Sequence, residues 1–137
     1  MRTINELKIL VALLGRKIGL KPDDEVYPMF SSDGALQSDG ATVYTDELYH
    51  YVVNDRNEEI ERVDSDQIED ILFAVFEEIT FNIAVDYELQ NRVEKQDGRR
   101  ILFAKQIELM NTLDSKLGSR MKEEVNNILK ESPYEDE

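Results

Sequence analysis

The sequence predicts an α+β fold in which a small antiparallel sheet packs on one long helix. Residues 66–91 repeat apolar side chains at every third or fourth position, which is typical of a helix that faces a core. Residues 47–63 are rich in tyrosine and valine around a polar turn, which is typical of a β-hairpin. Helical patterns also occur once before this region and twice after it. We therefore expect an N-terminal helix, the sheet, the long helix and two C-terminal helices.

Composition sets broad limits on the class of protein. The chain has 137 residues, which is enough for a single domain over residues 1–137 with a real core. Hydrophobic residues make up 41% and charged residues 34%, so we expect a globular protein with a highly charged surface. The chain contains no cysteine, which excludes disulfides and thiolate metal sites. The apolar run at residues 9–14 is too short to span a membrane and lacks a leader-cleavage pattern, so a cytoplasmic protein is expected.

The N-terminal third combines one clear helix with a largely irregular segment. Thr3 and Glu6 form a capping-box pattern that starts a helix over residues 4–18, before Gly19. Pro28 confines any strand near it to the edge of a sheet. Residues 31–41 contain two Asp-Gly pairs, which indicate a mobile loop or the end of a hairpin. A further strand is expected to begin near residue 41.

The hairpin at 47–63 should place alternate side chains on opposite faces of the sheet. Tyr49 and Tyr51 share one face, while His50 lies on the other. The return strand carries several glutamates, so we expect it to be an edge strand whose charges discourage further pairing. His50 is the only histidine of the chain, and we interpret it as a packed or surface residue and not as a catalyst.

Two helices should follow the long one, after a break around residues 95–98. Asp97 is a candidate cap for the first of them, Leu117-Gly118 a candidate end, and Ser119 the start of the last helix, which Pro133 ends. The final residues are expected to be frayed.

We interpret the charges near the break as a structural ion-pair cluster with a substantially buried Asp86, although a ligand or catalytic site remains an alternative. The cluster comprises Asp86, Glu88, Arg92, Glu94, Arg99 and Arg100.

The charge distribution indicates the kind of partner. The net charge is −14, which argues against a nucleic-acid-binding surface, and residues 57–70 carry seven acids against one arginine. Such a segment would attract a basic protein, and neighbouring tyrosines could anchor it. The predicted partner-binding residues are Tyr49, Tyr51, Glu58, Glu59, Glu61, Asp64 and Asp66. Loop 31–41 is the next candidate surface.

Motifs for chemistry are scarce, and neither a metal nor a cofactor is expected. The chain has no G-x-S-x-G turn and no glycine-rich phosphate loop. One enzymatic alternative is a magnesium-dependent nucleotide pyrophosphatase, because two acidic pairs lie on two predicted helices and weakly resemble the all-helical MazG-type enzymes. That family's pattern requires acids where this chain has Phe81 and Asn127. The two pairs are Glu77-Glu78 and Glu123-Glu124.

The sequence over about residues 47–134 resembles the immunity protein 63 family of bacterial polymorphic-toxin systems. The similar segments are LYHYVV, the Asp86-Tyr87-Glu88-Leu89 run followed by Arg92, Gln96-Asp97 with Arg99-Arg100, and the ending ESPYEDE. The resemblance implies an α+β cytoplasmic protein that binds and neutralises a cognate toxin without catalysis. A non-enzymatic scaffold or regulatory binding protein remains an alternative, and the oligomeric state is left open.

Overall fold

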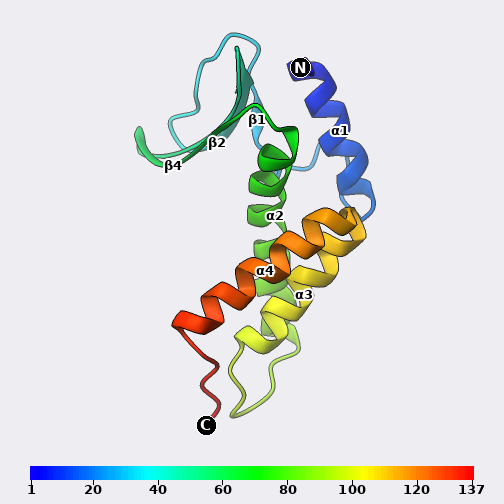
Figure 1. Cartoon of the computed structure of the whole chain (residues 1–137), viewed down its shortest axis with the longest axis vertical. Coiled ribbons are helices and arrows are strands. Elements are labelled where there is room, and N and C mark those ends of the chain that lie inside the picture. Colours follow the sequence, from blue (N-terminus) through cyan, green and yellow to red (C-terminus); the bar gives the residue numbers. More distant parts are fainter. The chain divides into compact units, whose positions relative to one another are not determined.

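The computed structural model describes residues 1–137 and contains four helices and four strands (Figure 1). The predicted α+β class is confirmed. In chain order the elements are α1 (Ile4–Arg16), β1 (Met29–Phe30), β2 (Gly40–Thr45), β3 (Tyr49–Asp55), β4 (Glu58–Ser65), α2 (Ile68–Gln90), α3 (Arg99–Leu113) and α4 (Ser115–Glu131). Tertiary contacts divide the chain into two compact units, Met1–Val75 and Phe76–Glu137. The expectation of a single domain therefore stays a prediction.

The sheet of the first unit has the strand order β1-β2-β3-β4. Strands β2, β3 and β4 are antiparallel, but β1 pairs with β2 in parallel through Met29 and Phe30. The sheet is thus mixed and not purely antiparallel as expected. The reason is the connection between β1 and β2, which is long enough to return the chain to the end of the sheet where β1 began.

The predicted hairpin is confirmed as β3 and β4. Its two turn residues, Arg56 and Asn57, have φ angles of 51° and 67°, as a two-residue type I′ turn requires. The pairing register shifts beside the turn, where Asn54 lies opposite Glu59 and Val53 opposite Glu61. Ile60 is the extra residue of this β-bulge. The predicted edge position of the return strand is also confirmed, since β4 ends the strand order.

The segment before β2, which we expected to be a mobile loop or the end of a hairpin, is held by hydrogen bonds to the turn of the β3–β4 hairpin. The Asn54 side-chain amide donates to the Gln37 carbonyl at 2.8 Å, and the Arg56 backbone N–H donates to Asp39 Oδ1 at 2.7 Å. The Asn57 N–H donates to the Ser38 carbonyl. These hydrogen bonds join residues that are far apart in the sequence, so they could not be predicted from the many turn residues of the segment.

The core of the first unit lies among α1, the sheet and the first two turns of α2. The Thr3 capping box begins α1, and Leu7 and Val11 are buried on the side of α1 where the helix contacts β1 and β2. The side chain of Tyr27 lies so close to Gly15 that a Cβ there would be 1.7 Å from the phenol oxygen. The other buried apolar residues are Val43, Tyr49, Tyr51, Val52, Ile71, Phe73, Ala74 and Val75.

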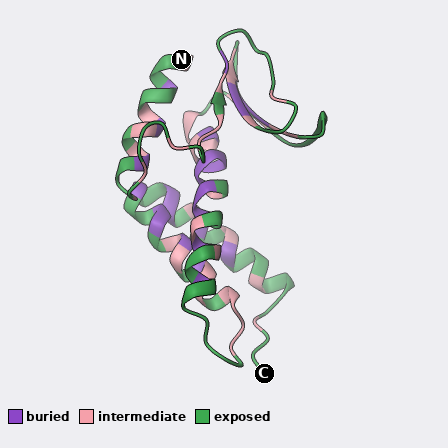
Figure 2. Ribbon diagram, turned by 180° about the vertical axis from the view of Figure 1, so that it is seen from behind, coloured by how far each residue is buried: buried purple, intermediate pink, exposed green.

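In the second unit, α3 and α4 form a helical hairpin with a one-residue link (Figure 2). Asp114 has extended backbone angles that end α3, and its carboxylate accepts hydrogen bonds from the N–H groups of Lys116 and Leu117 to start α4. The expected boundary at Leu117-Gly118 is therefore wrong. A Cβ at Gly118 would lie 2.8 Å from Asn111 Cα, so this glycine permits close helix packing and does not end a helix.

The remainder of α2 contacts α3 through a buried polar group. Gln106 is 2% exposed, and its amide donates to the Glu77 carbonyl at 3.0 Å and to Thr80 Oγ1 at 3.2 Å. The Thr80 hydroxyl in turn donates to the Phe76 carbonyl. This hydrogen-bonded amide favours one rotation of α3 about its own axis, because any other rotation would leave the buried Gln106 amide without hydrogen-bond partners. None of the four helices has the length and apolar content needed to cross a bilayer.

Candidate partner-binding surfaces

The acids predicted to bind a partner lie together on β4 and just before α2. All five are exposed, and they stand on an edge strand and the short link that follows it. The set, called here the acidic edge, comprises Glu58, Glu59, Glu61, Asp64 and Asp66. The structure therefore brings the charged part of the predicted surface to one edge of the sheet.

The two tyrosines predicted as partner anchors do not belong to this surface. Tyr49 is 4% and Tyr51 is 1% exposed, and the Tyr49 hydroxyl accepts a hydrogen bond from the Arg2 backbone N–H at 2.8 Å. Tyr51 lies opposite Val43 of β2, on the face of the sheet directed at the core. Because Val52 on the other face is also buried, alternation along β3 does not reveal which side is solvated. The exposed apolar residue of the hairpin is Ile60, at the bulge.

His50 occupies a position that the sequence analysis did not anticipate. Its Nδ1 lies 2.6 Å from Asp64 Oδ1, and its Nε2 lies 2.7 Å from Asp46 Oδ1. Only the doubly protonated imidazolium donates from both ring nitrogens. The ring also stacks on Tyr44, with centroids 4.3 Å apart. The cross-strand pairing of His50 with Asp64 creates the site. This pairing depends on the bulge at Ile60, because a register counted from the hairpin turn alone would place Val63 opposite His50.

The surroundings of His50, Asp64 and Asp46 determine the direction in which the pKa of each is shifted. Burial lowers the pKa of His50, but hydrogen bonds to Asp64 and Asp46 outweigh it, so the net pKa is raised. The pKa of Asp64 is lowered, chiefly by the hydrogen bond from His50. The pKa of Asp46 is lowered first by the Leu48 N–H and then by His50. All three shifts favour a charged histidine between two carboxylates.

Arg62 lies on the same face of the sheet as His50 and forms ion pairs with two of the five acids of the acidic edge. Its guanidinium lies 2.8 Å from Glu59 and 3.2 Å from Asp64, and it donates to the Tyr44 hydroxyl at 3.4 Å. Glu59 lies opposite Asn54 of β3, and Arg62 lies opposite Val52. Asn54 and Val52 are two residues apart and so share a face, and the bulge at Ile60 therefore places Glu59 on the same face as Arg62. We call the linked side chains of Asp46, His50, Asp64, Arg62 and Glu59 the His50 network.

The predicted ion-pair cluster is present in part, in the second unit. Glu88 and Arg92 form a two-point pair at 2.8 and 3.0 Å. The structure pairs Arg99 with Asp97 at 2.8 Å and Arg100 with Asp136 at 2.9 Å. Hydrogen bonds from Arg99 and from two backbone N–H groups hold the pKa of Asp97 well below its usual range.

Asp86 and Glu94 do not take part in the cluster, and the expected burial of Asp86 is wrong. Both residues are exposed and neither makes an ion pair. Asp86 lies on the solvent side of α2, whereas Glu88 is 6% exposed. Two positions along a helix turn a side chain by about 200°, so the two acids face opposite ways. The carboxylate of Glu88 approaches Gly98 so closely that a Cβ there would lie 2.8 Å from Glu88 Oε1.

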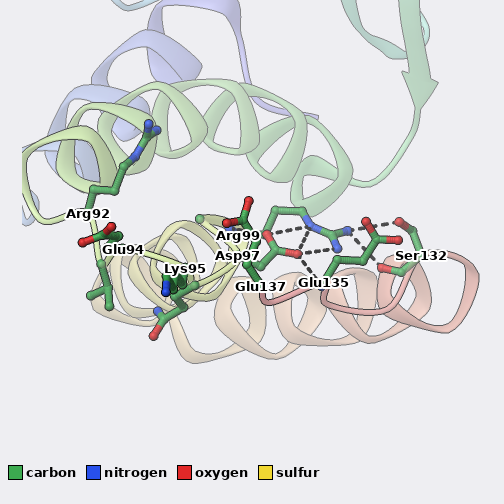
Figure 3. A pocket seen from close by; sticks show the side chains of 11 residues that line it. Arg92, Glu94, Lys95, Asp97, Arg99, Ser132, Glu135 and Glu137 are labelled. Carbon is green, nitrogen blue, oxygen red and sulfur yellow. Dashed lines mark hydrogen bonds and ion pairs between the residues drawn. The ribbon is translucent and has the colours of Figure 1, made fainter.

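The chain end is docked on the loop between α2 and α3, which corrects the expectation of a frayed tail. The Glu137 N–H donates to the Lys95 carbonyl, and the Glu135 N–H donates to Asp97 Oδ2. The Tyr134 ring lies 4.2 Å from the Arg100 guanidinium carbon. We call this arrangement the tail clasp (Figure 3).

An open cleft of about 670 Å³ lies at the tail clasp, between the loop and the chain end. Arg99 lines the cleft, but its N–H groups are already directed at Asp97 and at Ser132 (Figure 3). A further N–H group of Arg99 donates to the Pro133 carbonyl. Glu94, Glu135 and Glu137 add negative charge around it. Arg92 and Lys95 also line the cleft, but with Asp97 its four acids outnumber its three basic groups, so the cleft offers no net positive charge to an anionic ligand.

The structure places no three acidic or histidine side chains where they could hold a metal ion together. The four glutamates of the pyrophosphatase alternative thus do not form the acidic cage that the reaction needs. They are Glu77, Glu78, Glu123 and Glu124.

A family model described as Immunity protein 63 matches residues 46–127. The matched segment starts just before β3 and ends within α4, so it contains the acidic edge and the loop of the tail clasp. No curated protein and no solved structure is significantly similar to the chain.

Proposed function

Because the chain belongs to the immunity protein 63 family, we propose that it neutralises a cognate bacterial toxin by binding it directly in the cytoplasm. The family match over residues 46–127 carries this proposal. The mechanism is steric: the bound protein covers the working cleft of the toxin and performs no chemistry itself.

The acidic edge is the proposed toxin-binding surface. Residues 57–70 carry a net charge of −6, and Arg62, the one basic residue among them, is bonded to Glu59 and Asp64. Such a field attracts a basic partner and raises association rates by roughly 10–10³, with strong screening by salt. A toxin with a basic cleft, as in enzymes that hold nucleic acid, matches this surface.

Charge reversal of Glu58, Glu59 and Glu61 to lysine tests this surface. The probe is the C-terminal toxin domain of the large secreted protein that we expect a neighbouring gene to encode. Association should slow by roughly tenfold or more and lose most of its salt dependence. A matched control reverses Asp86, Glu94 and Glu123, which are exposed and lie in the second unit. It changes the net charge equally and should keep at least most of the wild-type rate.

Three outcomes decide between the hypotheses, once folding of each variant has been checked by circular dichroism. Slower binding and lost protection of cells by the acidic-edge variant alone would support the proposal. Equal effects of both variants would show that overall charge, and not this surface, attracts the toxin. If the wild-type chain neither binds the neighbouring toxin nor protects cells from it, a scaffold or regulatory function would replace the immunity function.

A further inference from the structure

Strand β4 is a long sheet edge whose outer side is open (Figure 1). It has eight residues, and its backbone makes no hydrogen bond to any other backbone except that of β3. An edge strand presents a row of N–H and C=O groups that can template another strand. The opposite edge, β1, has two residues and offers no comparable template.

The geometry of the hairpin identifies which groups face outward. The residues that flank a two-residue turn, Asp55 and Glu58, form a hydrogen-bonded pair, and bonded and non-bonded pairs alternate from there. With the bulge at Ile60 counted, the pairs that contain Arg62 and Asp64 are non-bonded. The backbone N–H and C=O groups of Arg62 and Asp64 therefore point away from β3.

We propose that the toxin adds an extended basic segment to this outer side of β4, as an additional antiparallel strand of the sheet. This inference rests on the proposed function and specifies how recognition occurs. The template spans residues 61–65, which pair with β3 without interruption between the bulge and α2. In such strand addition the main-chain bonds supply affinity, and the side chains along the edge supply specificity.

Charge determines which segment fits. Residues 58–65 carry four acids and one arginine, and that arginine is bonded to two of the acids. A second copy of β4 would place like charges opposite each other, which disfavours pairing, whereas lysine or arginine side chains would meet opposite charges. The occupant is therefore a basic segment of the partner and not another copy of this chain.

The edge is already ordered before a partner binds. The His50 network ties Asp64 to β3 through His50, at 2.6 Å, and ties Arg62 to the Tyr44 hydroxyl of β2. A surface held in its binding conformation loses less entropy on association. Ile60, the bulge residue just before the template, is 65% exposed and offers an apolar contact to the incoming strand.

Amide hydrogen exchange on the ¹⁵N-labelled full chain, alone and with the neighbouring toxin domain, tests the proposal. In the free protein the Arg62 and Asp64 amides should exchange rapidly, whereas those of Glu61 and Val63 should be protected. In the complex the Arg62 and Asp64 amides should slow by at least roughly tenfold. A cross-strand nuclear Overhauser effect from Val63 Hα to a toxin Hα should also appear, because Val63 would form a non-bonded pair with the new strand.

The outcomes separate this inference from the function on which it rests. A complex in which the Arg62 and Asp64 amides still exchange at their free rates would overturn strand addition and leave the immunity function intact. Slowed exchange without the cross-strand signal would show that the surface is covered without strand pairing, which also overturns the proposal. Absence of any complex would overturn both.

Discussion

His50 should be an imidazolium at neutral pH, and its titration gives the sharpest test of the His50 network. The chain has one histidine, so a single set of ring signals in an NMR titration reports this site. Hydrogen bonds to Asp64 and Asp46 raise its pKa above the ordinary value of 6.5. We expect the folded protein to titrate with a midpoint above 6.5. The Asp46→Asn variant should move that midpoint down, because one carboxylate partner is lost.

The same shifts fix the pH range over which the network stabilises the fold. Since the pKa of His50 is raised, its contribution is complete below pH 6.5 and is lost as the pH rises through the folded value. Since the pKa of Asp64 is lowered from 3.8, its contribution is complete above pH 3.8 and is lost as the pH falls through the folded value. The network should therefore stabilise most between pH 3.8 and pH 6.5.

The magnitude follows from the exposure of the partners. Hydrogen bonds to charged groups contribute about 1.5–3 kcal/mol when buried, but exposed ion pairs contribute only about 0–1 kcal/mol. The His50 side chain is 10% exposed, whereas those of Asp64 and Asp46 are 39% and 60% exposed. When His50 is removed, water can therefore form hydrogen bonds to the two carboxylates in its place. His50→Phe, which keeps the stacking on Tyr44, should cost about 1–2 kcal/mol at pH 5.5.

Urea unfolding of wild type and His50→Phe at pH 5.5 and pH 9 measures this cost. The difference between the two proteins should be smaller at pH 9 than at pH 5.5, because the contribution of the imidazolium is lost as the pH rises through the folded pKa of His50. The Asp86→Asn variant serves as a control, because Asp86 is exposed and unpaired, and it should match wild type at both pH values. A histidine midpoint at or below 6.5, or an equal cost at both pH values, would refute this account of the network.

Three further predictions concern the second unit. Gly118→Ala should lower the free energy of unfolding in urea by about 1–3 kcal/mol, because the clash with Asn111 exceeds the gain of about 1 kcal/mol in helix propensity. Ser119→Ala, at an exposed site, should leave the stability unchanged. A Gly118→Ala protein as stable as wild type would contradict this helix packing. Glu88→Ala should lower the urea midpoint and Asp86→Ala should leave it unchanged, so the reverse order would show that burial was assigned to the wrong acid. Removal of residues 133–137 should accelerate amide exchange in loop 91–98 without affecting β3 and β4, and unchanged loop exchange would show that the tail clasp does not order the loop.

The sequence alone determined the elements that depend on local interactions. The number and order of the helices, the start of α1, the hairpin and its turn follow from apolar spacing, caps and turn residues, all of which act within a few positions. The boundary between α3 and α4 was misplaced because glycine has two uses, helix termination and close packing. Only the approach of Asn111 shows which of them applies at Gly118. The charge of the acidic edge was likewise visible without a structure, since it is a sum over neighbouring residues.

The tertiary structure decided which side chains are buried and which charges meet. Tyr49 and Tyr51 were expected on a binding surface, but the core covers their face of β3. The strand register brings His50 within hydrogen-bond distance of Asp64, and the fold pairs Arg100 with Asp136, 36 residues away in the sequence. Asp86 and Glu88 were indistinguishable in sequence until the packing of α2 exposed one and covered the other. Burial and ion pairing depend on groups that the fold brings together from distant positions, and local patterns carry no information about those distances.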